Sequence, residues 1–287
     1  MSNNNNRTRH IIGLIMAFML AITLAFFGIF LILNFTFFSE SYLVDNLEAS
    51  NYFERAHQNI EDNIGYRGTP FGIPEDTLDG LITRGRVQED VERYLRNRIH
   101  QGDYILDTTF LTEGIDQRIR DLLTSEGVAI EEGQEEAISE FSMLAEGEYR
   151  NRTEIPFLGT YSSASRLFDR ATPFALAGLI LSMLFFSGML LKLFKKETAL
   201  GYFGLSLSAG GLLITALPLY LFITKPYERI QIHPESFYHY INQMVGTFIL
   251  VLLITGFLMI LASIPTLMYD YHHRNKLRRK RTVIKDY

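Results

Sequence analysis

The chain has 287 residues, a formal net charge of −5, and neither cysteine nor tryptophan. Without cysteine it can form no disulfide, no thiolate metal site and no cysteine nucleophile. The hydrophobic content of 47% is ordinary for a soluble protein, but the apolar residues gather in four almost uncharged runs. The composition therefore predicts a chain divided between apolar segments and a strongly polar remainder.

The first apolar run covers residues 11–33 and follows a short polar segment, residues 1–10. A helix rises about 1.5 Å per residue, so this run reaches roughly 35 Å, enough to cross a hydrocarbon core of about 30 Å. Arg7 and Arg9 precede it, as in a signal peptide, but the run is too long for an ordinary signal and no small-residue cleavage site follows. The pattern predicts an uncleaved signal anchor.

Three further runs predict transmembrane helices over residues 173–191, 199–223 and 244–268. Pro173 suits the first turn of a helix, where its missing N–H leaves no hydrogen bond unmade. The third run is rich in small residues, which let helix backbones approach closely in a bilayer. We expect helix packing, within the bundle or between two copies, at Gly204, Ser208 and Gly211.

Basic residues predict the orientation of these four spans. The N-terminal segment, the connection 192–198 and the tail 269–287 together hold twelve basic residues and three acidic ones. The positive-inside rule assigns all three to the cytoplasm, which agrees with an even number of spans. The chain is thus expected in a cell membrane, and a large outer segment without disulfides favours a bacterial envelope.

Residues 35–170 and 224–243 are then expected outside. The larger segment holds 27 acidic residues and 13 arginines but no lysine, a net charge of −14. The acids can keep this surface solvated, or they can attract a cationic partner. Nothing physical in the sequence explains the missing lysines.

Apolar residues at a 3–4 spacing predict helices in the outer segment over residues 41–64, 86–99, 112–123 and 134–149. Pro74 is expected to open a helix and Thr112 to cap one, with short extended pieces at 104–110 and 128–130. The aromatic segment 224–243 can lie at the membrane interface or pack against the larger outer segment. The predicted fold is an all-α membrane protein with four transmembrane helices and a mainly helical extracytoplasmic domain between spans 1 and 2.

Catalytic and metal-binding patterns are missing from the sequence. The four runs contain no Asp, Glu, Lys, Arg or His, with Lys192 at one edge, which argues against a proton-coupled transporter and an intramembrane protease. His233 and His239 are six residues apart with Pro234 between them, so they lack the spacing of a helical metal motif. The cluster of acidic residues from Glu131 to Glu140 predicts the solvent-exposed start of a helix. Neither a phosphate loop nor a dinucleotide fingerprint occurs. We predict no catalytic, cofactor-binding or metal-binding residue.

The basic tail is the short feature most suggestive of function. Such clusters attract anionic lipid headgroups by about 1 kcal/mol per charge, although a topology anchor explains them equally well. Nucleic acid is not an expected partner so close to a bilayer. The predicted membrane-surface contacts are Arg274, Lys276, Arg278, Arg279, Lys280 and Arg281.

In topology, the layout resembles permease subunits that couple an outer domain to a cytoplasmic ATPase in cell-division and macrolide-export systems. The resemblance implies a cytoplasmic ATPase partner. This chain departs from those permeases in its ten-residue N-terminal segment and in its short connection 192–198. The residues themselves favour a non-enzymatic binding, sensing or accessory subunit that contacts the lipid bilayer and an envelope protein. An enzyme acting on lipid or cell-wall polymer is the third hypothesis.

Overall fold

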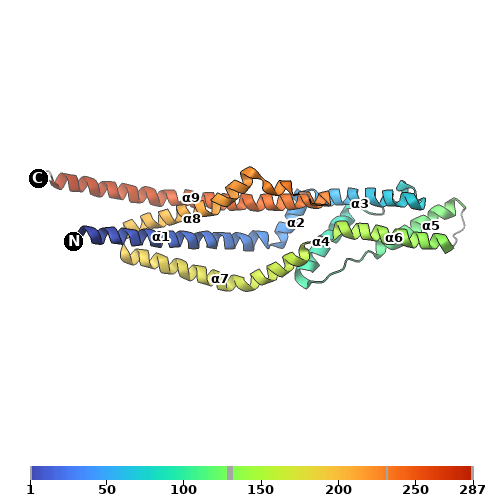
Figure 1. The fold of residues 1–287 in the computed structure, drawn as a ribbon, viewed down its shortest axis with the longest axis horizontal. Coiled ribbons are helices and arrows are strands. Elements are labelled where there is room, and N and C mark those ends of the chain that lie inside the picture. The colour runs from blue at the N-terminus through green and yellow to red at the C-terminus, as the bar shows by residue number, and fades with distance from the viewer. Residues whose placement is uncertain (1, 128–131, 231, 286–287) are drawn as a thin grey trace. The chain divides into compact units, whose positions relative to one another are not determined.

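The structure, a computed structural model, describes residues 2–127, 132–230 and 232–285, with side chains described from 7 to 273 apart from 75, 101, 128–132 and 231. Within these residues every regular element is a helix and no strand occurs (Figure 1). The all-helical prediction is confirmed for this part of the chain. The extended piece expected at 128–130 lies outside it.

The chain divides into two compact units. Unit 1 comprises residues 1–39, 168–230 and 245–287, and unit 2 comprises residues 40–167 and 231–244. Helices α7 (Leu158–Leu193) and α9 (Glu235–Lys285) each contribute residues to both units.

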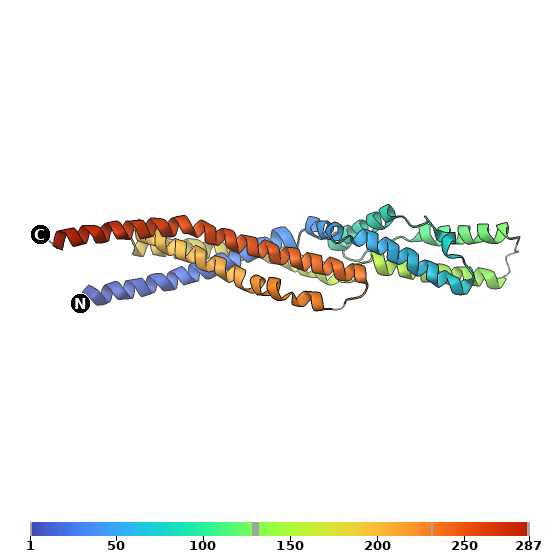
Figure 2. The ribbon, with the colours of Figure 1, turned by 90° about the horizontal axis from the view of Figure 1, so that it is seen from above.

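Unit 1 is built from four long helices. They are α1 (Ser2–Ile32, continued by a π-helical turn, Leu33–Phe37), the greater part of α7, α8 (Lys196–Thr224) and α9, with a short 3₁₀ turn, η4 (Pro226–Arg229), after α8. Figures 1 and 2 show these helices running alongside one another within the unit. The chain has four helices long and apolar enough to cross a membrane, which fits a multi-pass membrane protein.

Two helix starts differ from the prediction. Pro173 does not open a helix but lies inside α7, where it removes one backbone hydrogen bond. The last helix begins at Glu235, nine residues before the apolar run that starts at Met244. In both cases polar residues continue the helix beyond the apolar run. An apolar run marks the part of a helix that suits hydrocarbon, whereas the helix itself ends where its backbone hydrogen bonds end.

Helix α8 packs closely against α1 through small residues. Ser206 Oγ donates to the carbonyl of Ala17 at 2.8 Å. A Cβ atom placed on Gly210 would lie 3.0 Å from the carbonyl oxygen of Ala21, so a larger residue would push the two backbones apart. Ala17 and Ala21 are buried, as this close approach requires.

Helix α8 approaches α9 on another face. A Cβ atom on Gly211 would lie 2.6 Å from the carbonyl oxygen of Gly256, and one on Gly204 would collide with Thr266 Oγ1. Ser208, the third predicted packing residue, is half-buried on α8. Gly204 and Gly211 are thus placed where a helix inside the same unit occupies the space that a side chain would fill.

Unit 2 is a bundle of shorter helices. They are α2 (Glu40–Ala49), α3 (Tyr52–Gly68), α4 (Arg84–Gln101), α5 (Thr109–Ser125) and α6 (Glu132–Thr153), with 3₁₀ turns η2 (Thr69–Phe71) and η3 (Glu75–Leu78). The inward-facing apolar residues repeat every three or four positions along each helix, which gives each one a buried stripe. The largest fully buried side chains include Phe53, Ile60, Leu95, Leu111, Phe141 and Tyr149.

The helix predicted over residues 41–64 is interrupted. Asn51 adopts a left-handed conformation, with φ = 54°, and separates α2 from α3. Asparagine tolerates this conformation better than most residues. Ser50 strengthens the turn because its hydroxyl donates to the carbonyl of Leu47 at 3.0 Å.

Two predicted helix starts in unit 2 also need correction. Pro74 precedes only the 3₁₀ turn η3, and α4 begins ten residues later behind Thr83, whose hydroxyl accepts from the Arg86 amide at 3.2 Å. Thr112 does not cap α5 but lies in its first turn, where its hydroxyl donates to the carbonyl of Thr109 at 3.0 Å. A threonine near a helix start can satisfy its hydroxyl either way, so its presence alone does not fix the cap.

A buried carboxylate joins α4 to α6. Asp90 is fully buried, and its Oδ2 accepts from Arg86 Nε at 3.0 Å and from the Tyr149 hydroxyl at 2.7 Å. Arg86 also covers the ring of Phe110, with its guanidinium 4.2 Å from the ring centroid. Burial alone would lower the pKa of Arg86, but the hydrogen bond to Asp90 and the charge of that carboxylate outweigh it and raise the pKa. Arg86 therefore stays charged and compensates the buried acid.

The segment before span 4 belongs to the core of unit 2. Tyr240 is fully buried; its ring centroid lies 5.9 Å from that of Tyr52 and 6.2 Å from that of Phe157. Phe237 is also buried and packs against Phe157. Of the two placements open for the aromatic segment, packing against the larger segment is the one found for these two residues.

Gly211→Leu is expected to destabilise unit 1 by about 1–3 kcal/mol, because a side chain there overlaps the backbone of α9. The measurement is the midpoint of unfolding of the purified chain in increasing dodecyl sulfate. Gly188→Leu is the matched control, since a Cβ atom at Gly188 on α7 meets nothing within 4 Å. Equal midpoints for the two variants would contradict the α8–α9 contact.

Asp90→Ala is expected to destabilise unit 2 by about 3 kcal/mol, because it leaves the Tyr149 hydroxyl and the Arg86 guanidinium without their shared acceptor. Amide hydrogen exchange of α4 and α6, followed by mass spectrometry, should speed up more than about a hundredfold. Asp116→Ala, which breaks an exposed pair with Arg120, should change exchange in the same helices by less than about tenfold. Similar effects of both substitutions would show that the buried network contributes no special stability.

Candidate binding site

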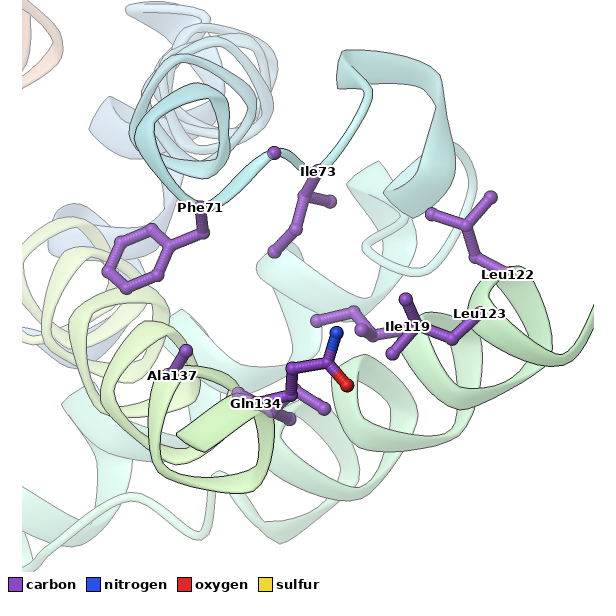
Figure 3. A pocket seen from close by; sticks show the side chains of 9 residues that line it. Phe71, Ile73, Ile119, Leu122, Leu123, Gln134 and Ala137 are labelled. Atoms are coloured by element: carbon purple, nitrogen blue, oxygen red, sulfur yellow. The ribbon is translucent and has the colours of Figure 1, made fainter. Parts of the chain in front are cut away.

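An apolar pocket of about 100 Å³ opens in unit 2 among η2, α5 and α6 (Figure 3). Hereafter this hollow is the apolar pocket. Its walls come from three separate parts of the sequence, and eight of its nine lining residues carry no polar side-chain group. The lining residues are Phe71, Gly72, Ile73, Ile119, Leu122, Leu123, Gln134, Ala137 and Ile138.

The floor of the apolar pocket is part of the core of unit 2. Ile73, Ile119 and Ile138 are between 4% and 8% exposed, whereas Leu122 and Leu123 are half-buried and surround the opening. Figure 3 shows the carboxamide of Gln134, the one polar side chain among the lining residues, directed into the space between α5 and α6. A carboxamide can both donate and accept hydrogen bonds. The pocket can therefore hold a small apolar group next to a polar atom.

Helices α5 and α6, which line the apolar pocket, also carry exposed carboxylates. Asp121 is next to Leu122 on α5, Glu126 follows one turn later, and Glu136 is next to Ala137 on α6; all three are exposed. The two arginines on this part of α5 are engaged. Arg118 donates to the carbonyl oxygens of Thr77 and Asp79 at 3.1 and 2.6 Å, and Arg120 pairs with Asp116 at 2.8 Å and with Glu135 at 3.6 Å.

A second hollow, of about 590 Å³, is an open groove lined by four carboxylates. A glycosidase-type mechanism needs one carboxylic acid kept protonated in an apolar setting. Here Asp62, Asp76 and Asp79 are exposed and Glu61 is half-buried, so all four are accessible to water. The groove therefore lacks, among its described lining residues, a carboxyl group in an apolar setting.

A third hollow, of about 620 Å³, includes His233 and Glu235 together with Glu148 and Arg152. Glu235 lies 3.4 Å from His239 Nε2 and 3.8 Å from the Arg55 guanidinium. Among the residues whose side chains are described, no group of three His, Asp or Glu residues is placed to hold a metal ion. The histidine–glutamate contacts are ion-pair and hydrogen-bond contacts at the surface of unit 2.

The site residues predicted from sequence fall elsewhere. The basic tail residues Arg274, Lys276, Arg278, Arg279, Lys280 and Arg281 follow the apolar part of α9, and their side chains lie outside the described residues. Gly204, Ser208 and Gly211 belong to α8 in unit 1. Neither group is among the described residues that line the apolar pocket, and the sequence did not predict this pocket.

The sequence did hold part of the signal for the apolar pocket. Ile119, Leu122, Leu123, Ala137 and Ile138 belong to the apolar stripes from which α5 and α6 were predicted. A stripe indicates that a helix face is covered, but it does not indicate how completely. The gap depends on Phe71 and Ile73, which approach from a segment full of glycine and proline whose path could not be predicted.

Comparison with known proteins adds no relative to these observations. No protein-family model, no curated protein and no solved structure matches the chain.

Proposed function

We propose that the chain is a non-enzymatic binding or sensing subunit of a bacterial cell envelope. In this proposal unit 1 crosses the membrane four times, both termini lie in the cytoplasm, and unit 2 lies outside and contacts an envelope protein. The observation that carries the binding role is the apolar pocket, on a unit that has its own buried core and many exposed carboxylates. The described residues around the two larger hollows are water-accessible acids and ion-pair partners, which supports a binding role over a catalytic one.

The composition of unit 2 supports the topology. Its two parts, residues 40–167 and 231–244, are separated in sequence by spans 2 and 3. Tyr240 from the second part packs against Tyr52 and Phe157 from the first. Segments that pack into one core must lie on the same side of a membrane. This is the arrangement that an even number of intervening spans produces.

Contacts at one end of unit 1 support the same topology. Arg9 donates to the carbonyl of Leu193, and His10 lies 2.9 Å from the Tyr202 hydroxyl. A Cβ atom on Gly201 would lie 2.6 Å from the carboxylate of Asp270. The N-terminal segment, the α7–α8 connection and the start of the tail thus gather together. These are the three segments that carry the basic residues, which favours the cytoplasmic side for all of them.

The alternative function is a permease-like transmission subunit that works with a cytoplasmic ATPase. Only Phe194 and Lys195 separate α7 from α8. A two-residue connection is a small surface on which to dock a cytoplasmic ATPase. The binding role is therefore the better supported of the two.

The absence of cysteine allows a clean test of topology. Ser139→Cys introduces one thiol on an exposed position of unit 2, and Thr282→Cys introduces one in the tail. A membrane-impermeant maleimide should label the first variant in intact cells and the second only after permeabilisation. The reverse pattern, or labelling of both in intact cells, would refute the proposed orientation.

The binding role is tested by photo-crosslinking in cells. Amine-reactive reagents are unsuitable because residues 35–170 contain no lysine. A benzophenone amino acid is therefore placed at Gln117 or Ser139, both exposed in unit 2, with Thr282 as the matched tail position. We expect one stoichiometric envelope protein to crosslink from unit 2 positions and not from the tail.

Two other results would reject the binding role. An ATPase that crosslinks from the tail, with nothing crosslinking from unit 2, would identify a transmission subunit. Crosslinks from neither place would leave unit 2 without a protein partner. An action on lipid or wall polymer would then become the hypothesis to pursue.

A further inference from the structure

We propose that residues 235–244, the first turns of α9, form a latch: they open from the core of unit 2 while the rest of that unit stays folded. Such a latch is independent of the binding role, because it is a motion within unit 2 and needs no partner. Two fully buried hydroxyl groups and the loose attachment of one end of the segment support it.

The latch carries two hydroxyl groups that are buried without a hydrogen bond. Ser236 and Tyr240 are one helical turn apart on α9, and both are 0% exposed. Among the described residues, neither Ser236 Oγ nor the Tyr240 hydroxyl has a hydrogen-bond partner. Burial raises the pKa of Tyr240, so its hydroxyl keeps the proton that it could donate. Water satisfies both groups once the latch opens, and each hydroxyl therefore weakens the closed state.

Aromatic packing holds the latch closed. The ring centroid of Tyr240 lies 5.9 Å from that of Tyr52 and 6.2 Å from that of Phe157. The ring of Phe237, also buried, lies 5.5 Å from that of Phe157. Burial of these rings stabilises the closed latch, whereas the hydroxyl on one of them opposes it. The ring and the hydroxyl of Tyr240 thus act in opposite directions.

The two ends of the latch are attached differently. At the far end the buried Tyr42 hydroxyl donates to the carbonyl of Met244. At the start the Arg55 guanidinium lies 3.8 Å from the Glu235 carboxylate, and these two side chains are 40% and 74% exposed. Ion pairs so exposed contribute little stability. Opening therefore begins at Glu235, and the turn at Met244 is held longest.

The latch is the start of a much longer helix. Helix α9 is continuous from Glu235 to Lys285, and its apolar run begins at Met244. Opening of the latch frees the first turns of the helix that carries this run. A partner of unit 2 that binds one state of the latch more tightly shifts the equilibrium toward that state.

Tyr52 provides a matched control for Tyr240. Its side chain is 2% exposed and contacts the Tyr240 ring, but its hydroxyl donates to the carbonyl of Arg152 at 2.7 Å. Arg152 lies in the last turn of α6, where backbone carbonyls have no partner within the helix. Removal of the Tyr52 hydroxyl therefore leaves an acceptor unpaired, whereas removal of the Tyr240 hydroxyl leaves no group unpaired among the described residues.

Amide hydrogen exchange of the full chain in lipid nanodiscs tests the role of the hydroxyls. Tyr240→Phe should slow exchange of residues 239–244 at least about fivefold, and Ser236→Ala should act in the same direction. Tyr52→Phe should speed exchange at the end of α6 and should not slow exchange of the latch. Unchanged exchange in α5 checks that each variant is folded.

A thiol probe tests whether the latch opens by itself. The chain has no cysteine, so Ser236→Cys places a single thiol inside the closed latch. Ser142→Cys, at an 8% exposed position of α6, is the control that needs α6 itself to open. A maleimide should label Ser236→Cys at least about tenfold faster than Ser142→Cys. Adding Tyr240→Phe to Ser236→Cys should slow its labelling at least about fivefold.

Two results would overturn the latch. Labelling of Ser236→Cys no faster than that of Ser142→Cys would show that the segment opens only together with the rest of unit 2. Faster exchange of residues 239–244 in Tyr240→Phe would show that this hydroxyl has a stabilising partner, such as a bound water, and does not weaken the closed state.

Discussion

Close backbone packing around α8 is the constraint on which unit 1 depends. Gly210 and Gly211 are adjacent in sequence, and one faces α1 while the other faces α9. Between apolar helices in a bilayer, lipid tails replace water, so hydrophobic burial drives association only weakly. Van der Waals contact and interhelical hydrogen bonds, such as that from Ser206 to Ala17, must then hold the helices together. Both require the small residues that α8 supplies.

Unit 2 is stabilised differently, as a water-soluble bundle would be. Its helices bury apolar stripes, and the fully buried carboxylate of Asp90 is compensated by Arg86 and Tyr149. Tyr240 packs residues 231–244 into the same core, although residues 168–230 separate this segment from the rest of the unit. This long-range contact joins residues 231–244 to residues 40–167 in one unit, whereas residues 35–39, 168–170 and 224–230, also expected outside, belong to unit 1.

The proposed function follows from how these two units differ. Unit 1 has small-residue packing within its helix bundle, and its apolar runs contain no Asp, Glu, Lys, Arg or His. Unit 2 has a surface rich in carboxylates and a hollow that its own described side chains leave open. A small apolar pocket on such a unit suits recognition of a partner better than chemical change of a substrate, which needs a group with a perturbed pKa in a cleft.

Helices were predicted well wherever apolar residues form a long run or repeat every three or four positions over a long segment. The prediction was wrong at helix boundaries where the conformation of a single residue decides whether the helix continues. Asn51 could have continued a helix but adopts a left-handed conformation, and Pro173 could have opened a helix but lies within one. The local sequence permits both outcomes at each position, and packing of the neighbouring segments selects one.

By itself, the sequence determined the all-helical class and the four helices able to cross a membrane, because each rests on local composition and on apolar runs that can be read directly. Only the tertiary structure decided which distant segments share a core. From sequence, the segment with Tyr240 could lie at the membrane interface or pack against the larger segment, and the contact of Tyr240 with Tyr52 shows the second placement for this residue. The apolar pocket, too, depends on Phe71, which approaches α5 and α6 from the 3₁₀ turn η2. A pocket is a space between segments, and no single segment encodes the space that its neighbours leave unfilled.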